Sequence, residues 1–126
     1  MCIRDRGTDG AASNNSLDMR SESKAASLVQ RHDHWDARIL DPIETWKLAT
    51  KGSNDWITWD LDDIRMRPFG RDGRRLLANL IYSSGRVLDV LVDGEPLRRD
   101  GNTLTIDENR TAREIEEAVV DYYAEI

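Results

Sequence analysis

The sequence predicts an α+β chain with about four helices and a short β-meander. Three observations predict this class. Asp41 and Asp107 each precede a stretch with helical spacing of apolar residues, as helix N-caps do. Residues 55–61 and 87–92 are rich in β-branched and aromatic residues, which favour strands. Two Asp-Gly pairs follow residue 92, and such pairs are typical of tight hairpin turns.

The first helix is expected to start near residues 14–16 and to run to about Arg31. The Asn and Ser side chains at its start can accept hydrogen bonds from free backbone N–H groups. Helical periodicity then places one apolar side on the helix, which we expect to be its buried side: Leu17, Ala25, Leu28 and Val29.

The second helix has the clearest start signal in the chain. Asp41 is the expected N-cap, Pro42 the first helical residue and Glu44 the returning carboxylate of a capping box. This helix should carry the apolar residues Ile43, Trp46, Leu48 and Ala49, and Gly52 should end it.

The rest of the chain alternates strands and helices. A strand is expected over residues 55–61, and a helix over 74–85 with Leu76, Leu77, Leu80 and Ile81 on its apolar side. Strands should follow at 87–92 and 103–106, with turns at Asp93–Gly94 and Asp100–Gly101. Asp107 should cap a last amphipathic helix that buries Ile115, Ala118, Val119, Tyr122 and Ile126.

Composition excludes several classes of function. The 126 residues are too few for a complete (β/α)8 barrel, which needs roughly 250. The net charge of -6 argues against a nucleic-acid partner. The longest apolar run, residues 76–82, is interrupted by Asn79 and far shorter than a membrane helix, so no membrane partner is expected. Cys2 is the single cysteine, which excludes an internal disulfide and favours a cytoplasmic location.

The first six residues, "MCIRDR", resemble a translated sequencing-adapter scar. We interpret residues 1–6 as a non-native leader and exclude them from the fold. On this interpretation Gly7 is not a natural beginning of the protein.

His32 and His34 form an H-x-H pair, which on a strand could bind a metal ion. Here the pair follows a predicted helix in a polar stretch, where residues two apart do not share a face. A metal site needs three or four ligands, and the chain offers no further His. Solvated or capping histidines are therefore the favoured interpretation.

The four tryptophans allow two interpretations. Trp46, Trp56 and Trp59 could form a base-stacking platform, but without a basic surface core packing is favoured. Trp35 could instead cover a groove or an interface.

Asp9 is the strongest candidate for chemistry. It lies between Gly7 and Gly10, where the backbone can turn sharply and a ligand can approach closely. A carboxylate in such a place can serve as a metal ligand or a general base. The alternative is an ordinary turn, since Thr-Asp-Gly is a common sequence.

Four segments carry a resemblance to a known family. "GTDGAASNNSLDM", residues 7–19, resembles the segment that follows the eighth barrel strand in the deaminase and chlorohydrolase branch of the amidohydrolase superfamily. The nearest subgroup is that of the 5-methylthioadenosine/S-adenosylhomocysteine deaminases. "SESKAASLVQR", which follows, looks like the eighth barrel helix. "DWITWDLDDIRMRP" and residues 78–108 are similar to the C-terminal β-sandwich portion of that family.

The resemblance implies a division of the chain and of its parent. The parent would be a (β/α)8 metal-dependent hydrolase barrel with a small β-sandwich, and this chain its C-terminal fragment. Residues 7–54 would hold the end of the last barrel strand and the terminal barrel helices, 55–107 part of the β-sandwich, and 108–126 a C-terminal helix.

The resemblance also implies an activity and a site. The parent would hydrolytically deaminate an amino-bearing heteroaromatic small molecule, such as an adenosine thioether. Asp9 would bind a divalent metal, zinc being expected, and would move the proton of the metal-activated water. The other metal ligands of the family are absent here, so the isolated chain is expected to be inactive.

Two departures from the family accompany this resemblance. The connection between Lys51 and Asp55 is shorter than usual, and residues 32–40 match poorly.

The alternative function is a small non-catalytic α+β interaction module that would use its tryptophan-bearing surface.

Overall fold

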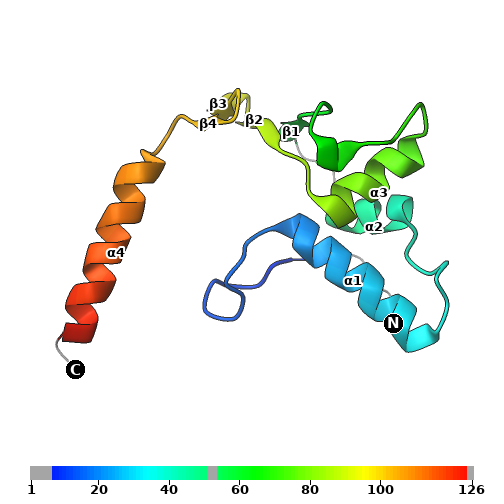
Figure 1. The fold of residues 1–126 in the computed structure, drawn as a ribbon, viewed down its shortest axis with the longest axis horizontal. Coiled ribbons are helices and arrows are strands. Elements are labelled where there is room, and N and C mark those ends of the chain that lie inside the picture. Colours follow the sequence, from blue (N-terminus) through cyan, green and yellow to red (C-terminus); the bar gives the residue numbers. More distant parts are fainter. Residues whose placement is uncertain (1–6, 51–53, 125–126) are drawn as a thin grey trace. The chain divides into compact units, whose positions relative to one another are not determined.

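The computed structural model describes residues 7–50 and 54–124 (Figure 1). These residues form two compact units, which interleave along the chain. The first unit holds residues 7–50 and 60–86, and the second holds residues 54–59 and 87–124. The expected division into 7–54, 55–107 and 108–126 was linear, and the assignment of these segments to parts of a parent barrel remains a prediction. No described helix is long and apolar enough to cross a membrane.

The first unit is helical. It contains α1 (Met19–His34), α2 (Pro42–Ala49), the short 3-10 helix η1 (Ile64–Met66) and α3 (Gly73–Ser83). The three α-helices pack against one another, and η1 packs against α3. The core is small and consists of four apolar side chains with relative exposure of 5% or less: Ala26, Met66, Leu80 and Ile81.

Helix α1 differs from the prediction in its start and in its buried side. It begins at Met19, after the N-cap Asp18, whose carboxylate accepts from the Arg20 backbone N–H. The buried side consists of the small residues Ser23, Ala26 and Ser27. The expectation that Leu17, Ala25, Leu28 and Val29 are buried is wrong, because all four are exposed.

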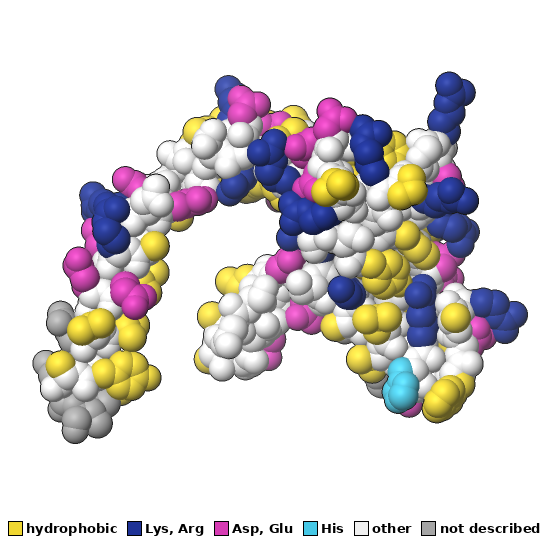
Figure 2. All heavy atoms as spheres, in the orientation of Figure 1, with side chains coloured by type: hydrophobic (Ala, Val, Ile, Leu, Met, Phe, Trp, Pro, Cys, Tyr) yellow, Lys and Arg dark blue, Asp and Glu magenta, His cyan; other side chains and the backbone are white. Residues whose placement is uncertain are grey.

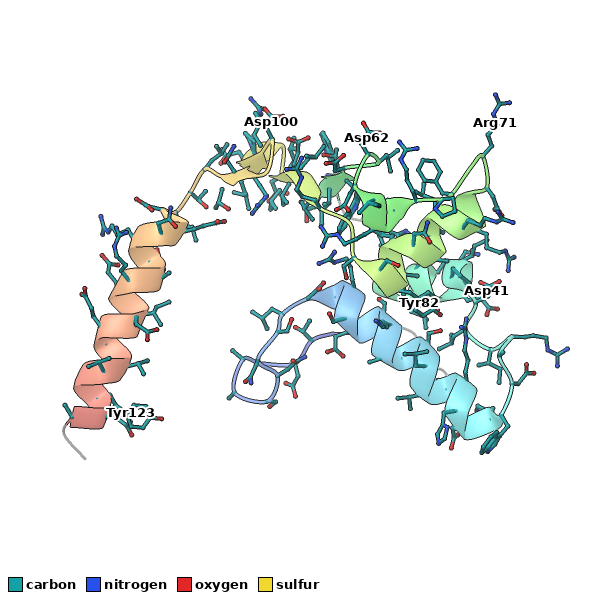
Figure 3. All side chains as sticks on the ribbon, in the orientation of Figure 1. Asp41, Asp62, Arg71, Tyr82, Asp100 and Tyr123 are labelled. Atoms are coloured by element: carbon teal, nitrogen blue, oxygen red, sulfur yellow. The ribbon has the colours of Figure 1, made fainter. Side chains whose placement is uncertain are left out.

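The reason lies in how α1 meets its neighbours. Small side chains let its backbone approach α2 and α3 closely enough for hydrogen bonds. The Ser27 hydroxyl donates to the Leu40 carbonyl at 3.0 Å and lies 2.6 Å from the hydroxyl of Tyr82. Tyr82 is labelled on α3 in Figure 3. The Leu40 carbonyl also accepts from Arg31 at 3.0 Å and from the Thr45 hydroxyl at 2.8 Å. Three side chains thus converge on one carbonyl where the connection between α1 and α2 ends.

Helix α2 confirms its predicted start signal. The Asp41 carboxylate accepts from the backbone N–H groups of Ile43 and Glu44, and the Glu44 carboxylate accepts from the Asp41 N–H. Helix α2 ends at Ala49, and the predicted end at Gly52 lies outside the described residues. On α3, Leu80 and Ile81 are buried, while Leu76 and Leu77 are half-buried.

The second unit contains a four-stranded antiparallel sheet, ordered β1-β2-β3-β4. The strands are β1 (Trp56–Trp59), β2 (Val87–Val92), β3 (Glu95–Arg99) and β4 (Asn102–Thr103). Both predicted Asp-Gly turns are confirmed, because Asp93, Gly94, Asp100 and Gly101 all have positive φ. The expected core role is wrong for Trp56, which is 51% exposed on an edge strand, while Trp46 and Trp59 are half-buried.

The last helix, α4 (Glu108–Ala124), confirms its predicted cap but not its predicted burial. The Asp107 carboxylate accepts from the Arg110 N–H at 3.0 Å. Its apolar residues are exposed: Ile115, Ala118, Val119 and Tyr122 (Figure 2). The expectation of burial is wrong for these four because no described element covers them, and Ile126 lies outside the described residues.

Candidate functional site

The candidate residue Asp9 lies in the loop of residues 7–18 that precedes α1. Its side chain is exposed, and its carboxylate Oδ1 accepts from the Gly10 backbone N–H at 2.7 Å. The sharp backbone conformation falls on Asp9 itself, with φ of 58°, whereas Gly7 and Gly10 do not have positive φ. Aspartate is one of the few residues besides glycine that tolerate this left-handed region. The space beside the two neighbouring glycines is open, since a Cβ at Gly7 or Gly10 would meet nothing within 4 Å.

Asn14 holds this loop together. The Gly10 carbonyl accepts from the backbone N–H groups of Ser13 at 2.9 Å and Asn14 at 3.0 Å, which closes a turn. The Asn14 side-chain amide then donates to the Thr8 carbonyl at 3.1 Å and to the Glu22 carboxylate at 2.7 Å. The sequence did not predict the bond to Glu22, because a contact eight residues away cannot be read from capping rules.

The described residues do not form a complete metal site. No group of three or more His, Cys, Asp or Glu side chains lies close enough together to hold a metal ion within residues 7–50 and 54–124. Asp9 offers one exposed carboxylate, whereas catalytic zinc takes three protein ligands and an open position. We therefore assign no chemical step through a metal to this chain alone.

The structure does not bring the two histidines and Asp9 together in one site. His32 and His34 are exposed in the last turn of α1, at the opposite end of the helix from the Asp9 loop. The His34 ring nitrogen lies 3.8 Å from the Asp33 carboxylate, and the His32 ring lies 5.6 Å from the Trp35 ring, centroid to centroid. Their position in the last helical turn agrees with the favoured interpretation as solvated or capping residues.

The aspartates with shifted pKa values in the first unit have structural partners. Hydrogen bonds from the Arg65 guanidinium hold the pKa of Asp63 well below its usual range. The backbone N–H of Glu44 and the nearby Arg74 guanidinium lower the pKa of Asp41. Both carboxylates cap helices, so their shifts report local folding and not a reactive centre.

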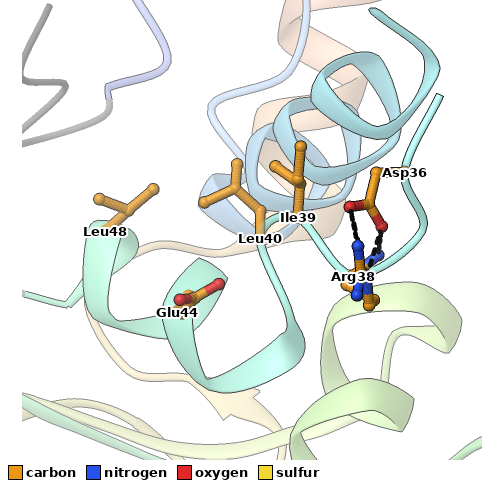
Figure 4. Close-up of a pocket in the computed structure, with 6 residues that line it drawn as sticks. All are labelled: Asp36, Arg38, Ile39, Leu40, Glu44 and Leu48. Carbon is orange, nitrogen blue, oxygen red and sulfur yellow. Dashed lines mark hydrogen bonds and ion pairs between the residues drawn. The ribbon is translucent and has the colours of Figure 1, made fainter. Parts of the chain in front are cut away.

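An open hollow of about 670 Å³ lies beside the α1–α2 connection (Figure 4). Its wall combines the Asp36–Arg38 ion pair, at 2.8 Å, with apolar side chains from Ile39, Leu40 and Leu48. Asp9 does not line this hollow, so the hollow and the candidate loop are separate features.

Known proteins similar to this chain are deaminases. No protein-family profile matches the chain. The chain is 36% identical over 120 residues to a 5-methylthioadenosine/S-adenosylhomocysteine deaminase from Bacillus cytotoxicus, covering 82% of this chain and 27% of that protein. It is 27% identical to a 5'-deoxyadenosine deaminase from Methanocaldococcus jannaschii, covering 88% of this chain and 30% of that protein.

A solved structure agrees with these relatives. The fold matches an adenosine deaminase from Xanthomonas campestris, crystallised with bound zinc, with a TM-score of 0.74 and 28% identity. The match covers 88% of this chain and 29% of the solved chain. This chain therefore spans less than a third of the length of the relatives it matches. By sequence and by fold, the chain is similar to part of the deaminases of the amidohydrolase superfamily, among them the 5-methylthioadenosine/S-adenosylhomocysteine deaminases.

Proposed function

We propose that this chain is part of a metal-dependent amidohydrolase that hydrolytically deaminates an amino-bearing heteroaromatic substrate of the adenosine thioether class. The observation that carries the proposal is the match to deaminases over more than four fifths of this chain but less than a third of theirs. The same partial coverage supports a fragment, and we propose that the chain alone is inactive. A cytoplasmic location belongs to the same proposal.

Asp9 is the residue of this chain that we propose to act in the parent enzyme. Its Oδ1 accepts one hydrogen bond, from Gly10, and the space beside the loop is open. An exposed carboxylate of this kind can serve as one ligand of a divalent metal, and the zinc bound in the Xanthomonas campestris enzyme supports zinc as that metal. A carboxylate in this place can also accept and return a proton during hydrolysis.

A hybrid enzyme tests the proposal. Residues 7–126 would replace the matching segment of the Bacillus cytotoxicus deaminase, and ammonia release from 5'-methylthioadenosine would be measured. We expect the hybrid to release ammonia. Asp9→Asn should lower kcat by about 10²-fold or more, because asparagine has the shape of aspartate but is neither a charged metal ligand nor a base. Asp33→Asn, which changes an exposed carboxylate on α1, is the matched control. An Asp9→Asn hybrid with unchanged kcat would refute the proposed role.

A separate experiment tests whether the isolated chain binds zinc: the chain is titrated with zinc, and the heat of binding is measured by calorimetry. We expect no stoichiometric binding, because the described residues offer no cluster of three ligands. Stoichiometric binding with micromolar affinity or better would contradict the proposal that the chain is an incomplete site.

The alternative function, a small non-catalytic interaction module, has one observation in its favour. Trp35 is 88% exposed at the end of α1, where it stabilises no described core. Large exposed aromatic residues are common at protein interfaces. An inactive hybrid, together with capture of a defined protein partner that Trp35→Ala abolishes, would favour this alternative.

A further inference from the structure

Asn14 differs from the residues around it. It is the half-buried side chain in the stretch of residues 10–17, whose other members are all exposed. Every polar group of its side chain has a partner. The amide nitrogen donates to the Thr8 carbonyl and to the Glu22 carboxylate, and the amide oxygen accepts from the Ser16 N–H at 3.1 Å. Asn15, the neighbouring residue of the same type, is exposed.

These bonds join the two ends of the Asp9 loop. Thr8 directly precedes Asp9 in the chain. The hydrogen bond from the Asn14 amide to the Thr8 carbonyl therefore fixes the backbone immediately before Asp9. The bond to Glu22 is charge-assisted and short, at 2.7 Å, and it connects the same amide to the first turns of α1. The loop is therefore attached to a helix through one side chain.

Helix α1 is in turn held by the rest of the first unit. Near Glu22, the Arg20 guanidinium donates to the Gly85 carbonyl at 3.1 Å, and the Lys24 ammonium donates to the Tyr82 carbonyl at 3.2 Å. Ser23 is buried in the adjoining turn. The Glu22 carboxylate consequently stands on a helix whose position is fixed at three neighbouring residues.

We propose that Asn14 and Glu22 are positioning residues that hold the Asp9 carboxylate in its working orientation. This inference rests on the proposed function, which assigns the chemistry to Asp9. Neither residue would touch the substrate. Because small displacements of a reacting group cost large factors in rate, loosening this contact should lower kcat and leave KM nearly unchanged.

The first test uses the isolated chain and NMR, with the Gly10 amide as the reporter because it donates to the Asp9 carboxylate. We expect Asn14→Ala and Glu22→Ala to shift the Gly10 and Ser13 amide signals and to speed their hydrogen exchange. Glu22→Gln should retain the native signals, since its side-chain oxygen still accepts from Asn14. Asn14→Asp should behave like Asn14→Ala, because it removes the donor. Asn15→Ala is the matched control and should change neither amide.

The double variant Asn14→Ala/Glu22→Ala separates a specific contact from two independent effects. If the two side chains act through one bond, the double variant should perturb the Gly10 amide no more than either single variant. Unchanged Gly10 and Ser13 signals in both single variants would overturn the proposal, and so would full additivity.

The second test uses the hybrid deaminase. Asn14→Ala and Glu22→Ala should each lower kcat by about 10²-fold with KM nearly unchanged, and Glu22→Gln should restore kcat. Unchanged kcat in an active hybrid would overturn the positioning role. A hybrid that is inactive with the unaltered segment would instead count against the proposed function, while the NMR measurement on the isolated chain still decides whether Asn14 and Glu22 hold Asp9.

Discussion

The carboxylate of Asp41 joins two helices, because it caps α2 with one oxygen and accepts from the Arg74 guanidinium with the other. Oδ1 accepts from Ile43 and Glu44 at 2.9 Å each, and Oδ2 lies 2.5 Å from the Arg74 nitrogen. Arg74 stands in the first turn of α3. One side chain thus satisfies the start of α2 and ties it to α3 within the first unit.

This relationship predicts a dependence of stability on pH. The backbone N–H of Glu44 and the Arg74 charge lower the folded-state pKa of Asp41 below its usual value of 3.8. The contribution of Asp41 is therefore complete above about pH 5 and is lost as the pH falls through the folded-state pKa. Urea unfolding should show that Asp41→Ala lowers the midpoint strongly at neutral pH and much less near pH 2 to 3.

The control for this prediction is Asp33→Ala, which removes an exposed carboxylate from α1 without removing a cap. Its midpoint should stay close to that of the unaltered chain at both pH values. An Asp41→Ala effect of equal size at neutral and acidic pH would show that the charge of Asp41 contributes nothing.

The small core of the first unit predicts a sharp contrast between two apolar truncations. Ile81 is 1% exposed on α3, whereas Val29 is 61% exposed on α1. Ile81→Ala should lower the free energy of unfolding by about 2–5 kcal/mol, and Val29→Ala should change it by about 0.5 kcal/mol or less. Urea titrations monitored by circular dichroism would measure both. Equal losses would mean that Val29 is covered in solution.

Local signals in the sequence predicted much of this fold. The Asp41 capping box, the two Asp-Gly turns and the Asp107 cap each depend on residues within four positions of one another, so their chemistry can be read directly. The order of the four α-helices was confirmed. The expected strand over residues 103–106 is wrong beyond Thr103, and β3 (Glu95–Arg99) was not predicted.

Long-range choices could not be predicted from the same signals. Periodicity located an apolar stripe on α1, but it does not say whether that stripe or the opposite small-residue side meets other helices. In the structure Ser23 and Ser27 are buried on α1. The Ser27 hydroxyl donates to the Leu40 carbonyl outside the helix, and the Ser23 hydroxyl donates to the Met19 carbonyl within it. The start of α1 was predicted too early for a related reason, since the Asn14 side chain is engaged with Glu22 and Thr8.

Glycine positions in the two units predict opposite effects of the same substitution. Gly94 has φ of 83° in the β2–β3 turn, whereas Gly73 begins α3, where φ is not positive and an added Cβ would meet open space. Gly94→Ala should cost about 1–2 kcal/mol, because alanine is strained in the left-handed region. Gly73→Ala should stabilise by up to about 1 kcal/mol. Thermal melts of both variants test this, and a stabilised Gly94→Ala chain would contradict the assigned turn.

The backbone conformation of Trp35 predicts that replacing this residue with glycine increases the stability of the first unit. It ends α1 with φ of 51°, and its backbone N–H donates to the Arg31 and His32 carbonyls. Glycine suits this position far better than tryptophan, and the 88% exposed indole contributes little to the described core. Trp35→Gly should therefore raise the stability of the first unit by about 1 kcal/mol. Trp35→Ala, which retains the Cβ strain, should be nearly neutral, and a clear loss in both variants would mean that the indole packs in solution.

The exposed apolar side of α4 predicts that this helix is the least protected element. Val119 and Tyr122 are 46% and 64% exposed, and most of the stability of a helix in a protein comes from packing of its apolar side. Amide hydrogen exchange at low protein concentration should therefore show rapid exchange across α4 and slow exchange in the buried turns of α3 around Leu80. Val119→Glu should leave the unfolding midpoint of the first unit unchanged. If α4 amides are protected as well as those of α3, and the protection is independent of concentration, then α4 packs on its own chain and its apolar side is not free.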